Sequence, residues 1–237
     1  MSNLSRRKFL ITAAGSAAGA MWLAACGGSN KPSSKSAATG ANAPEVTGVT
    51  LGFIALTDSS PLIIAKEKGF FAKHGMPDVK VVKQTSWAVT RDNLELGGAK
   101  GGIDGAHILS PMPLLLTAGT ITKSKQSLPM YTLARLNTQG QAISASKELL
   151  DEKLSVNNKE ALAKASKGLG RKIKAAVTFP GGTHDLWMRY WMSANGLDPN
   201  KDADLVVIPP PQMVANMKTG TMDLFCVGEP WNQRLVN

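Results

Sequence analysis

The sequence is poor in the residues that build disulfide frameworks and metal sites. Its 237 residues include two cysteines, Cys26 and Cys226, and three histidines, His74, His107 and His184. Two cysteines give no disulfide framework, and the histidines lack the spacing typical of metal ligands. Cys226 lies in the apolar run DLFCVG, which favours a buried free thiol that packs as a small hydrophobic residue.

Dense basic runs and catalytic signatures are also absent. The net charge is +10, but the 27 basic residues are scattered, which favours solvated surface side chains over a nucleic-acid groove. There is no G-x-S-x-G elbow, no P-loop and no G-x-G-x-x-G after an expected strand. Ser86, His184 and Asp58 could be assembled on paper into a hydrolytic triad, but nothing in the sequence favours that arrangement. We therefore expect neither an enzyme nor a nucleic-acid partner.

The N-terminus carries two export signals. Arg6 and Arg7 precede an apolar stretch rich in Ala and Gly, which ends in LAAC at Cys26 and resembles a bacterial lipobox. We interpret residues 1–25 as a twin-arginine lipoprotein signal peptide and Cys26 as the lipidated residue; the stretch is too weakly apolar to favour an uncleaved membrane helix. Residues 26–45, rich in Gly, Ser, Ala and Pro, are expected to form a flexible tether. The protein should then be anchored by lipid to the outer, periplasmic face of the cytoplasmic membrane.

Beyond the tether, one layout of strand, tight turn, helix, glycine and strand occurs twice. Each copy has about 30 residues, the length of a βαβ crossover. The expected strands lie at 49–56, 78–84, 174–179 and 203–209, and the expected helices at 61–68 and 183–195. A G-x-x-D element follows each copy, at 101–106 and 220–225, before a short buried strand.

The repeated layout predicts two α/β lobes. We assign the first lobe to residues 46–142 and the second, incomplete lobe to residues 171–237. Residues 143–170 have a charged, helical pattern and are interpreted as a helical insertion at the lobe boundary.

Candidate binding residues lie in the turns after the strands, because ligands of open α/β sheets sit beyond the carboxyl ends of the strands. These turns are at 57–61, 85–88, 109–113, 180–184 and 228–231. The turn at Gly181 and Gly182 opens a helix, so it is expected to present unpaired N–H groups and the positive end of the helix dipole. His184 can donate a hydrogen bond while neutral, and Trp87 and Trp231 offer indole N–H donors. The turns therefore favour a site for a small anion.

Other residues have simpler structural interpretations. Leu186, Trp187, Met188, Tyr190, Trp191 and Met192 repeat at helical spacing and are expected to pack in the core. We expect His107 to be a core histidine with satisfied hydrogen bonds, His74 to lie in a solvated turn, and Glu229 to lie at a turn or lobe interface.

Several longer stretches resemble a known family. AKEKGFFAKHGM resembles the first-lobe signature of solute-binding proteins of ABC importers. SWAVTRDNLELG, RLNTQGQAIS, VTFPGGTHDLWMRYWM, IPPPQMVANMKTGTMD and FCVGEPWN are similar to the nitrate- and bicarbonate-binding lipoproteins of such importers. The resemblance covers nearly everything from Val46 to Asn237. It implies a two-lobed type II periplasmic-binding-protein fold, with mostly parallel sheets flanked by helices, that closes on a small oxyanion and delivers it to an ABC permease with its ATPase subunits.

Carried over motif by motif, the resemblance implies four ligand-binding residues, Trp87, Gln141, His184 and Gly228. Nitrate or nitrite is the expected ligand; the alternative is bicarbonate, which would bring a calcium ion, and no other cofactor or metal is expected. Family members continue beyond Asn237. In the nitrate-binding members a lysine there completes the pocket, and in the bicarbonate-binding members an acidic residue and a calcium ion complete it. We therefore interpret the chain as C-terminally truncated, with an incomplete second crossover.

Two hypotheses from other classes remain. Some relatives sense the same anions for a regulatory partner, but the lipobox disfavours a cytoplasmic sensor. The wider fold superfamily also includes pyrimidine-synthesising enzymes, whose reactive histidine and cofactor site are not found in this sequence.

Overall fold

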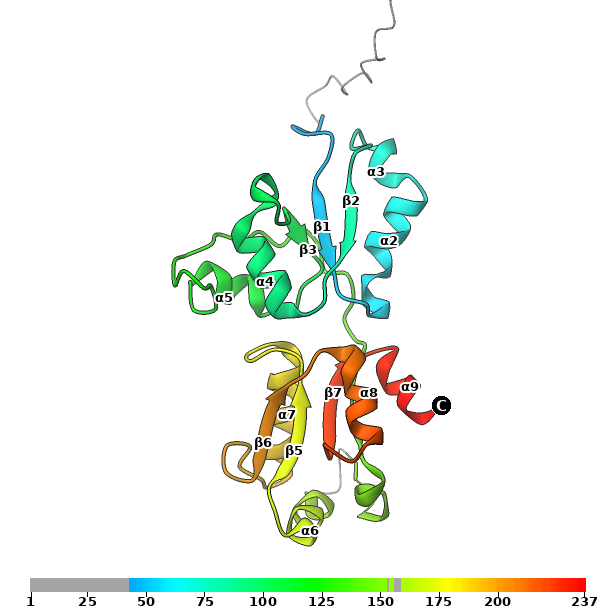
Figure 1. Ribbon diagram of the computed structural model, residues 1–237, viewed down its shortest axis with the longest axis vertical. Helices are drawn as coiled ribbons and strands as arrows, with labels where there is room; N and C mark the ends of the chain where they lie inside the picture. Colours follow the sequence, from blue (N-terminus) through cyan, green and yellow to red (C-terminus); the bar gives the residue numbers. More distant parts are fainter. Residues whose placement is uncertain (1–42, 153, 156–158) are drawn as a thin grey trace, which may run out of the picture. The chain divides into compact units, whose positions relative to one another are not determined.

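The computed structural model describes residues 43–152, 154–155 and 159–237, which form two α/β lobes (Figure 1). The expected signal peptide, Cys26 and nearly all of the tether lie outside the described residues. Pro44–Asn237 form one compact unit. None of the helices in the described ranges is long and apolar enough to cross a membrane.

The first lobe contains a parallel sheet with the strand order β2-β1-β3. Its strands are β1 (Thr50–Phe53), β2 (Lys80–Lys83) and β3 (Gly105–Ala106). Its helices are η1 (Thr57–Ser59), α2 (Ser60–Glu67), α3 (Phe70–Lys73), α4 (Trp87–Leu96), η2 (Gly98–Lys100) and α5 (Met112–Thr117). Proline at the second position of α2 has the fixed φ that a helix start needs, as the Ser60-Pro61 pair indicates.

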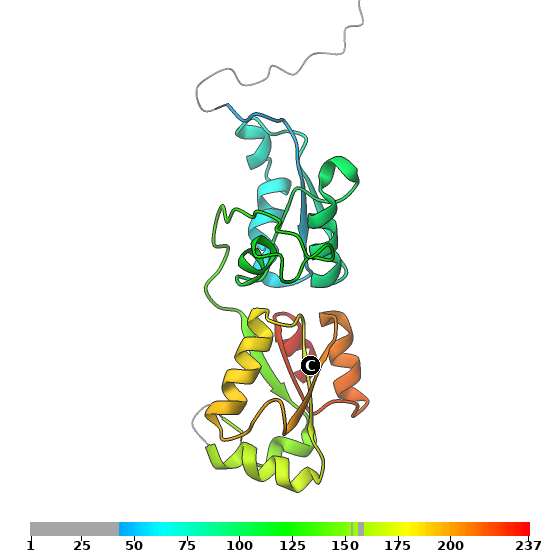
Figure 2. The same cartoon turned by 90° about the vertical axis from the view of Figure 1, so that its left-hand side faces the viewer.

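The second lobe contains a mostly parallel sheet with the order β4-β7-β5-β6. Its strands are β4 (Gln141–Ala145), β5 (Ile173–Val177), β6 (Ala203–Val207) and β7 (Leu224–Gly228), with β4 antiparallel to β7. Its helices are η3 (Lys147–Glu152), α6 (Lys159–Leu169), α7 (Thr183–Ala194), α8 (Pro210–Lys218) and α9 (Trp231–Val236). Helices α7 and α8 cover opposite faces of this sheet (Figures 1 and 2).

The boundary between the lobes differs from the sequence expectation. Strand β4 pairs with β7 along its whole length, so residues 141–145 belong to the second sheet. The expected boundary at residue 142 cuts through this strand, and the segment that follows it is helical only from Lys147 onward.

The predicted duplication is present in the fold. Strands β6, β5 and β7 have the same order as β2, β1 and β3, and the two G-x-x-D elements hold equivalent places. Asp104 accepts a hydrogen bond from Thr50 N at 2.7 Å, and Asp223 accepts one from Lys174 N at 2.8 Å. Each carboxylate thus binds the amide of its lobe's central strand at the start of that strand, and the two-lobed α/β fold is confirmed.

Helix α7 shows how the core is selected. Met188, Trp191 and Met192 are buried against the second sheet, as expected from their i, i+3, i+4 spacing. The prediction is wrong for Leu186, Trp187 and Tyr190, whose exposed fractions are 50, 54 and 70%. These three residues lie on the opposite side of the helix. The helix therefore carries more apolar residues than the sheet can cover.

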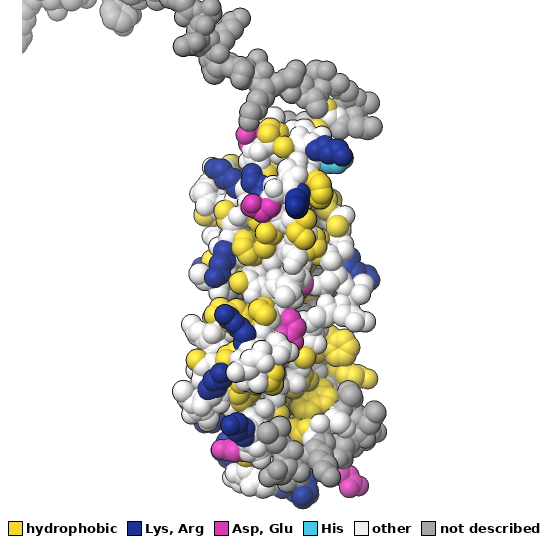
Figure 3. Space-filling model, turned by 90° about the vertical axis from the view of Figure 1, so that its right-hand side faces the viewer, with side chains coloured by type: hydrophobic (Ala, Val, Ile, Leu, Met, Phe, Trp, Pro, Cys, Tyr) yellow, Lys and Arg dark blue, Asp and Glu magenta, His cyan; other side chains and the backbone are white. Residues whose placement is uncertain are grey.

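The basic residues do not gather on the face that Figure 3 shows. Most of its Lys and Arg side chains lie along the left side of the view, separated by hydrophobic and uncharged groups, and they form no dense cluster. This distribution agrees with solvated surface lysines, as the sequence indicated.

Candidate functional site

The four expected ligand residues lie where the strands end. Trp87 opens α4 after β2, His184 lies in the first turn of α7 after β5, and Gly228 ends β7. Gln141 begins β4, which runs antiparallel to β7, and so lies at the same edge of the second sheet as Gly228. In this fold class that edge is where ligands bind.

Trp87 and His184 are in contact although they come from different lobes. Their ring centroids are 5.5 Å apart with an interplanar angle of 59°. Trp87 is fully buried and His184 is 3% exposed. The indole Nε1–H of Trp87 is buried without a hydrogen-bond partner. Because buried donors in native proteins are nearly always paired, this N–H is a candidate donor to a ligand.

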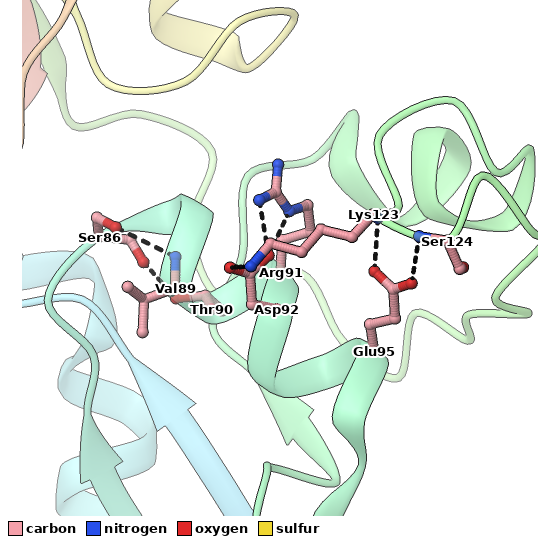
Figure 4. Close-up of polar contacts among 8 residues, drawn as sticks. All are labelled: Ser86, Val89, Thr90, Arg91, Asp92, Glu95, Lys123 and Ser124. Atoms are coloured by element: carbon pink, nitrogen blue, oxygen red, sulfur yellow. Dashed lines mark hydrogen bonds and ion pairs between the residues drawn. The ribbon is translucent and has the colours of Figure 1, made fainter.

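The N-terminal cap of α4, shown in Figure 4, fixes the start of the helix, and Trp87 is its first residue. Ser86 Oγ accepts a hydrogen bond from Val89 N at 3.1 Å, and Thr90 Oγ1 donates to Ser86 O at 3.0 Å. Further along the helix, Glu95 accepts hydrogen bonds from the amides of Lys123 and Ser124. These contacts fix both ends of the helix and therefore the position of the indole.

His184 is neutral at physiological pH. Burial lowers the pKa of His184 to about 4, which the charge of Asp58 opposes and that of His107 reinforces. Its Nδ1 lies 2.7 Å from the hydroxyl oxygen of Thr178, which is itself buried. If the Thr178 hydroxyl donates in this bond, the imidazole proton resides on Nε2, which then can donate to a ligand.

Gln141 and Gly228 are direct partners across the β4–β7 ladder. Glu229 N donates to Gly140 O, so the neighbouring Gln141–Gly228 pair is of the non-hydrogen-bonded kind. The Gly228 amide therefore points away from β4, toward the side of the sheet on which β5 lies. A Cβ at Gly228 would lie 3.1 Å from Gly140 O and 3.4 Å from Leu56 Cδ2, so a side chain would crowd both neighbours.

Residues 54–59 lie next to both the Trp87–His184 pair and the Gln141–Gly228 pair. Thr57 N donates to Glu229 O at 2.8 Å, next to Gly228, which confirms Glu229 as an interface residue. Leu56 belongs to the same core cluster as Trp87, Phe179 and other residues of both lobes.

Several donors that the sequence offered are already in use. Gly181 N donates to the Asp185 carboxylate at 2.8 Å, and Gly182 N donates to Phe179 O at 3.0 Å. The expectation that this glycine turn presents unpaired N–H groups is therefore wrong for both residues. Trp231 Nε1 donates to Ala55 O at 3.0 Å, so this indole holds the lobes together rather than facing a ligand.

A contact that the sequence did not reveal joins Asp58 and His107. His107 Nε2 lies 3.1 Å from Asp58 Oδ1, and His107 is 7% exposed, which confirms its burial. Its Nδ1 is buried without a partner, so the expectation of a satisfied histidine is wrong. Burial opposes ionisation of Asp58, but hydrogen bonds from the side chains of His107 and Asn137, together with the charge of His107, hold the pKa of the carboxyl below its ordinary value. The available signal was that both residues follow the carboxyl ends of strands.

The hydrolytic triad that the sequence allowed on paper is not assembled. Ser86 Oγ caps α4 and His184 Nδ1 contacts Thr178, so Ser86, His184 and Asp58 do not assemble a triad. Among the residues that the structure describes, there is no group of three or more His, Cys, Asp or Glu side chains that could hold a metal ion. Cys226 is a buried free thiol, as predicted, and burial raises its pKa to about 12.

Comparison with known proteins places the chain among anion-binding relatives. The profile of the NMT1-like family matches residues 42–237. The nitrate/nitrite binding protein NrtA of Synechococcus elongatus is 69% identical over all of this chain and 56% of its own length. The bicarbonate-binding protein CmpA of the same organism is 43% identical over 98% of this chain and 53% of its own length.

A solved structure shows the same fold. The crystal structure of the periplasmic nitrate-binding protein NrtA from Synechocystis superposes with a TM-score of 0.78 at 58% identity, over 82% of this chain and 50% of that one. The chain thus spans about half the length of the curated relatives it matches.

Proposed function

Because the chain belongs to the NMT1-like family, we propose that it is part of a binding protein for nitrate or nitrite that serves an ABC importer. The identity of 69% to a nitrate/nitrite binding protein, against 43% to a bicarbonate-binding one, supports nitrate or nitrite over bicarbonate. The protein binds its ligand without converting it.

One observation carries this proposal: the buried, unpartnered indole N–H of Trp87 in contact with the neutral ring of His184. Nitrate is planar, carries one negative charge and has acceptor oxygens but no donor. Neutral N–H donors in a water-excluding site suit such an ion, because each hydrogen bond to a charged acceptor is stronger than a neutral one. We assign Trp87 Nε1–H, His184 Nε2–H, the Gln141 side chain and the Gly228 amide to this role.

The two lobes supply these groups from opposite sides. Trp87 belongs to the first lobe, whereas Gln141, His184 and Gly228 belong to the second. An anion bound by all four favours the closed arrangement, because only that arrangement offers every donor at once. The closed, loaded form is the one that we propose is presented to the permease and its ATPase subunits.

The proposed location is the periplasm, which the periplasmic relative supports. Within it, Cys26 carries the lipid that holds the protein at the outer face of the cytoplasmic membrane, as the lipobox indicates. Cys26→Ser should release the protein into the soluble fraction and leave anion affinity unchanged. Membrane retention of this variant would contradict the lipid anchor.

The proposal is tested by isothermal titration of the full-length protein with nitrate, nitrite and bicarbonate, the last with and without calcium. Binding of nitrate or nitrite supports the proposal, and binding restricted to bicarbonate with calcium would establish the alternative. Absence of heat with all three ions would refute anion import. A sensor-kinase or antiterminator gene beside this one would instead favour a sensing role.

His184 provides the residue-level test. His184→Ala should weaken nitrate binding by about 1–3 kcal/mol, since it removes a buried hydrogen-bond partner of a charged ligand. His184→Gln, which keeps an N–H near the place of Nε2, should retain part of the affinity. His74→Ala is the matched control, because His74 is exposed in a turn of the first lobe. Equal affinities of the wild type and His184→Ala would show that His184 is structural.

A further inference from the structure

Asp58 and His107 lie together at the carboxyl edge of the first sheet. Asp58 is on η1 after β1, and His107 directly follows β3, the neighbour of β1 in the sheet. Their facing atoms, Oδ1 and Nε2, are 3.1 Å apart. Both Asp58 Oδ1 and His107 Nδ1 are buried; Oδ1 faces His107 Nε2, whereas Nδ1 has no partner. An unsatisfied buried atom such as His107 Nδ1 is uncommon in native structures and calls for a functional explanation.

The pair lies beside the proposed anion site. The backbone of η1 contacts the second lobe next to Gly228, through the hydrogen bond from Thr57 N to Glu229 O. Asp58 and His107 also both act electrostatically on His184, in opposite directions. Any charge on this pair is therefore felt by an ion that contacts His184.

A carboxylate beside the proposed site repels a bound anion. Coulomb repulsion scales with the charge of the ligand, so Asp58 repels a dianion roughly twice as strongly as a monoanion. His107 reduces this repulsion, because a proton on Nε2 faces the carboxylate whether the imidazole is neutral or charged. The balance between the two groups then sets how much negative charge the site accepts.

We propose that Asp58 and His107 form a charge pair that selects the valence of the bound anion: His107 offsets the carboxylate enough for a monoanion to bind, and Asp58 rejects dianions. This inference rests on the proposed function. It assigns specificity to two residues that the four-residue ligand set does not include.

The test compares nitrate and sulfate binding by isothermal titration of the full-length wild type, His107→Gln, Asp58→Asn and the double variant. His107→Gln should weaken nitrate binding about tenfold, because the carboxylate is then poorly compensated. Adding Asp58→Asn should restore nitrate affinity to within about threefold of the wild type, the non-additivity expected of directly coupled groups. Asp58→Asn alone should raise the affinity for sulfate relative to nitrate by about tenfold.

A structural role would give a different pattern. If the pair only holds the loop, both single variants lose nitrate affinity, the double variant loses at least as much, and sulfate is rejected throughout; this result would overturn the proposal. His74→Gln is the control for a histidine substitution in the same lobe, and circular dichroism confirms that each variant is folded.

A ligand-free measurement separates this inference from the proposed function. In an NMR titration, Asp58→Asn should lower the pKa of His184 further and His107→Gln should raise it, because Asp58 raises and His107 lowers that pKa in the wild type. Unchanged values would remove the coupling and overturn the inference while nitrate binding by the wild type stands. Absence of nitrate binding by the wild type, with the shifts present, would instead refute the proposed function.

Discussion

Replacement of Trp87 by Phe should weaken anion binding and leave the stability of the protein nearly unchanged. Trp87 is fully buried, contacts His184 and has an indole N–H without a partner. Phe keeps an aromatic ring in the core cluster and removes the donor. In the ligand-free protein, loss of the unpaired donor should raise the free energy of unfolding, whereas the smaller ring should lower it.

The magnitudes follow from burial. Removal of an unsatisfied buried donor relieves a desolvation penalty of about 1–3 kcal/mol. The smaller ring leaves about 40 Å³ unfilled, which costs about 1 kcal/mol in cavity energy, in addition to the lost transfer energy of the removed atoms. We therefore expect the free energy of unfolding to change by less than about 1.5 kcal/mol. Nitrate affinity should fall by about 1–3 kcal/mol, because a hydrogen bond to a charged ligand is lost.

Trp231→Phe is the matched control. Trp231 is also buried, but its Nε1 donates to Ala55 O at 3.0 Å. Removal of this donor leaves a partly buried carbonyl unpaired, so the variant should lose about 1–2 kcal/mol of stability. Urea unfolding measures both stabilities, and isothermal titration with nitrate measures the affinity of Trp87→Phe.

The reasoning would be refuted by the reverse outcome. If Trp87→Phe lost more than about 3 kcal/mol of stability and bound nitrate as tightly as the wild type, Trp87 would be a packing residue. The same stability loss in both tryptophan variants would show that the unpartnered N–H has no energetic consequence.

Three further outcomes are expected. Burial lowers the pKa of His184 to about 4, so between pH 6.5 and 4 the unfolded chain binds more protons than the folded protein. The contribution of His184 to the free energy of unfolding, up to about 3 kcal/mol, is therefore complete above pH 6.5 and is lost as the pH falls to about 4. In urea unfolding curves recorded over a series of pH values, His184→Gln should flatten this part of the pH dependence. Asp223→Ala removes a buried carboxylate that accepts from Lys174 N and pairs with the exposed Arg171, and it should cost about 1–3 kcal/mol in thermal or urea unfolding, whereas the exposed Asp104→Ala should cost about 1 kcal/mol. A Cβ at Gly182 would lie 2.5 Å from Leu109 Cδ1, so Gly182→Ala should destabilise by about 1–3 kcal/mol and Leu109→Ala should recover part of that loss in the double variant.

The order of elements could be predicted because it depends on local patterns. The helix over 183–195 and the strands around it follow from apolar spacing and from the glycines that end them, and α7 covers Thr183–Ala194. Which residues of that helix are buried could not be predicted, because the apolar residues cover more than one face. Packing against the sheet buries the side of the helix that carries Met188 and leaves the side with Trp187 exposed.

The pairing of strands that lie far apart in the chain was harder to predict from the sequence. Gln141–Ala145 is a five-residue strand whose partner, β7, lies more than 75 residues further along the chain. No turn signal connects the two strands, so the expected boundary at residue 142 divides β4 between the first lobe and the helical insertion. For the same reason, Gln141 entered the expected site through the family resemblance alone, whereas Trp87, His184 and Gly228 also lie in turns after expected strands.

The sequence by itself determined which chemical groups reach the ends of the strands: indoles, glycine amides, a histidine and a carboxylate. Only the tertiary structure decided which of them are already hydrogen-bonded. Trp87 and Trp231 carry the same donor, but Trp231 meets a carbonyl 176 residues away in the chain, whereas Trp87 meets an aromatic ring and keeps its N–H unpaired. A hydrogen bond requires two atoms within about 3 Å of each other, and for residues so far apart in the chain that distance exists only after folding.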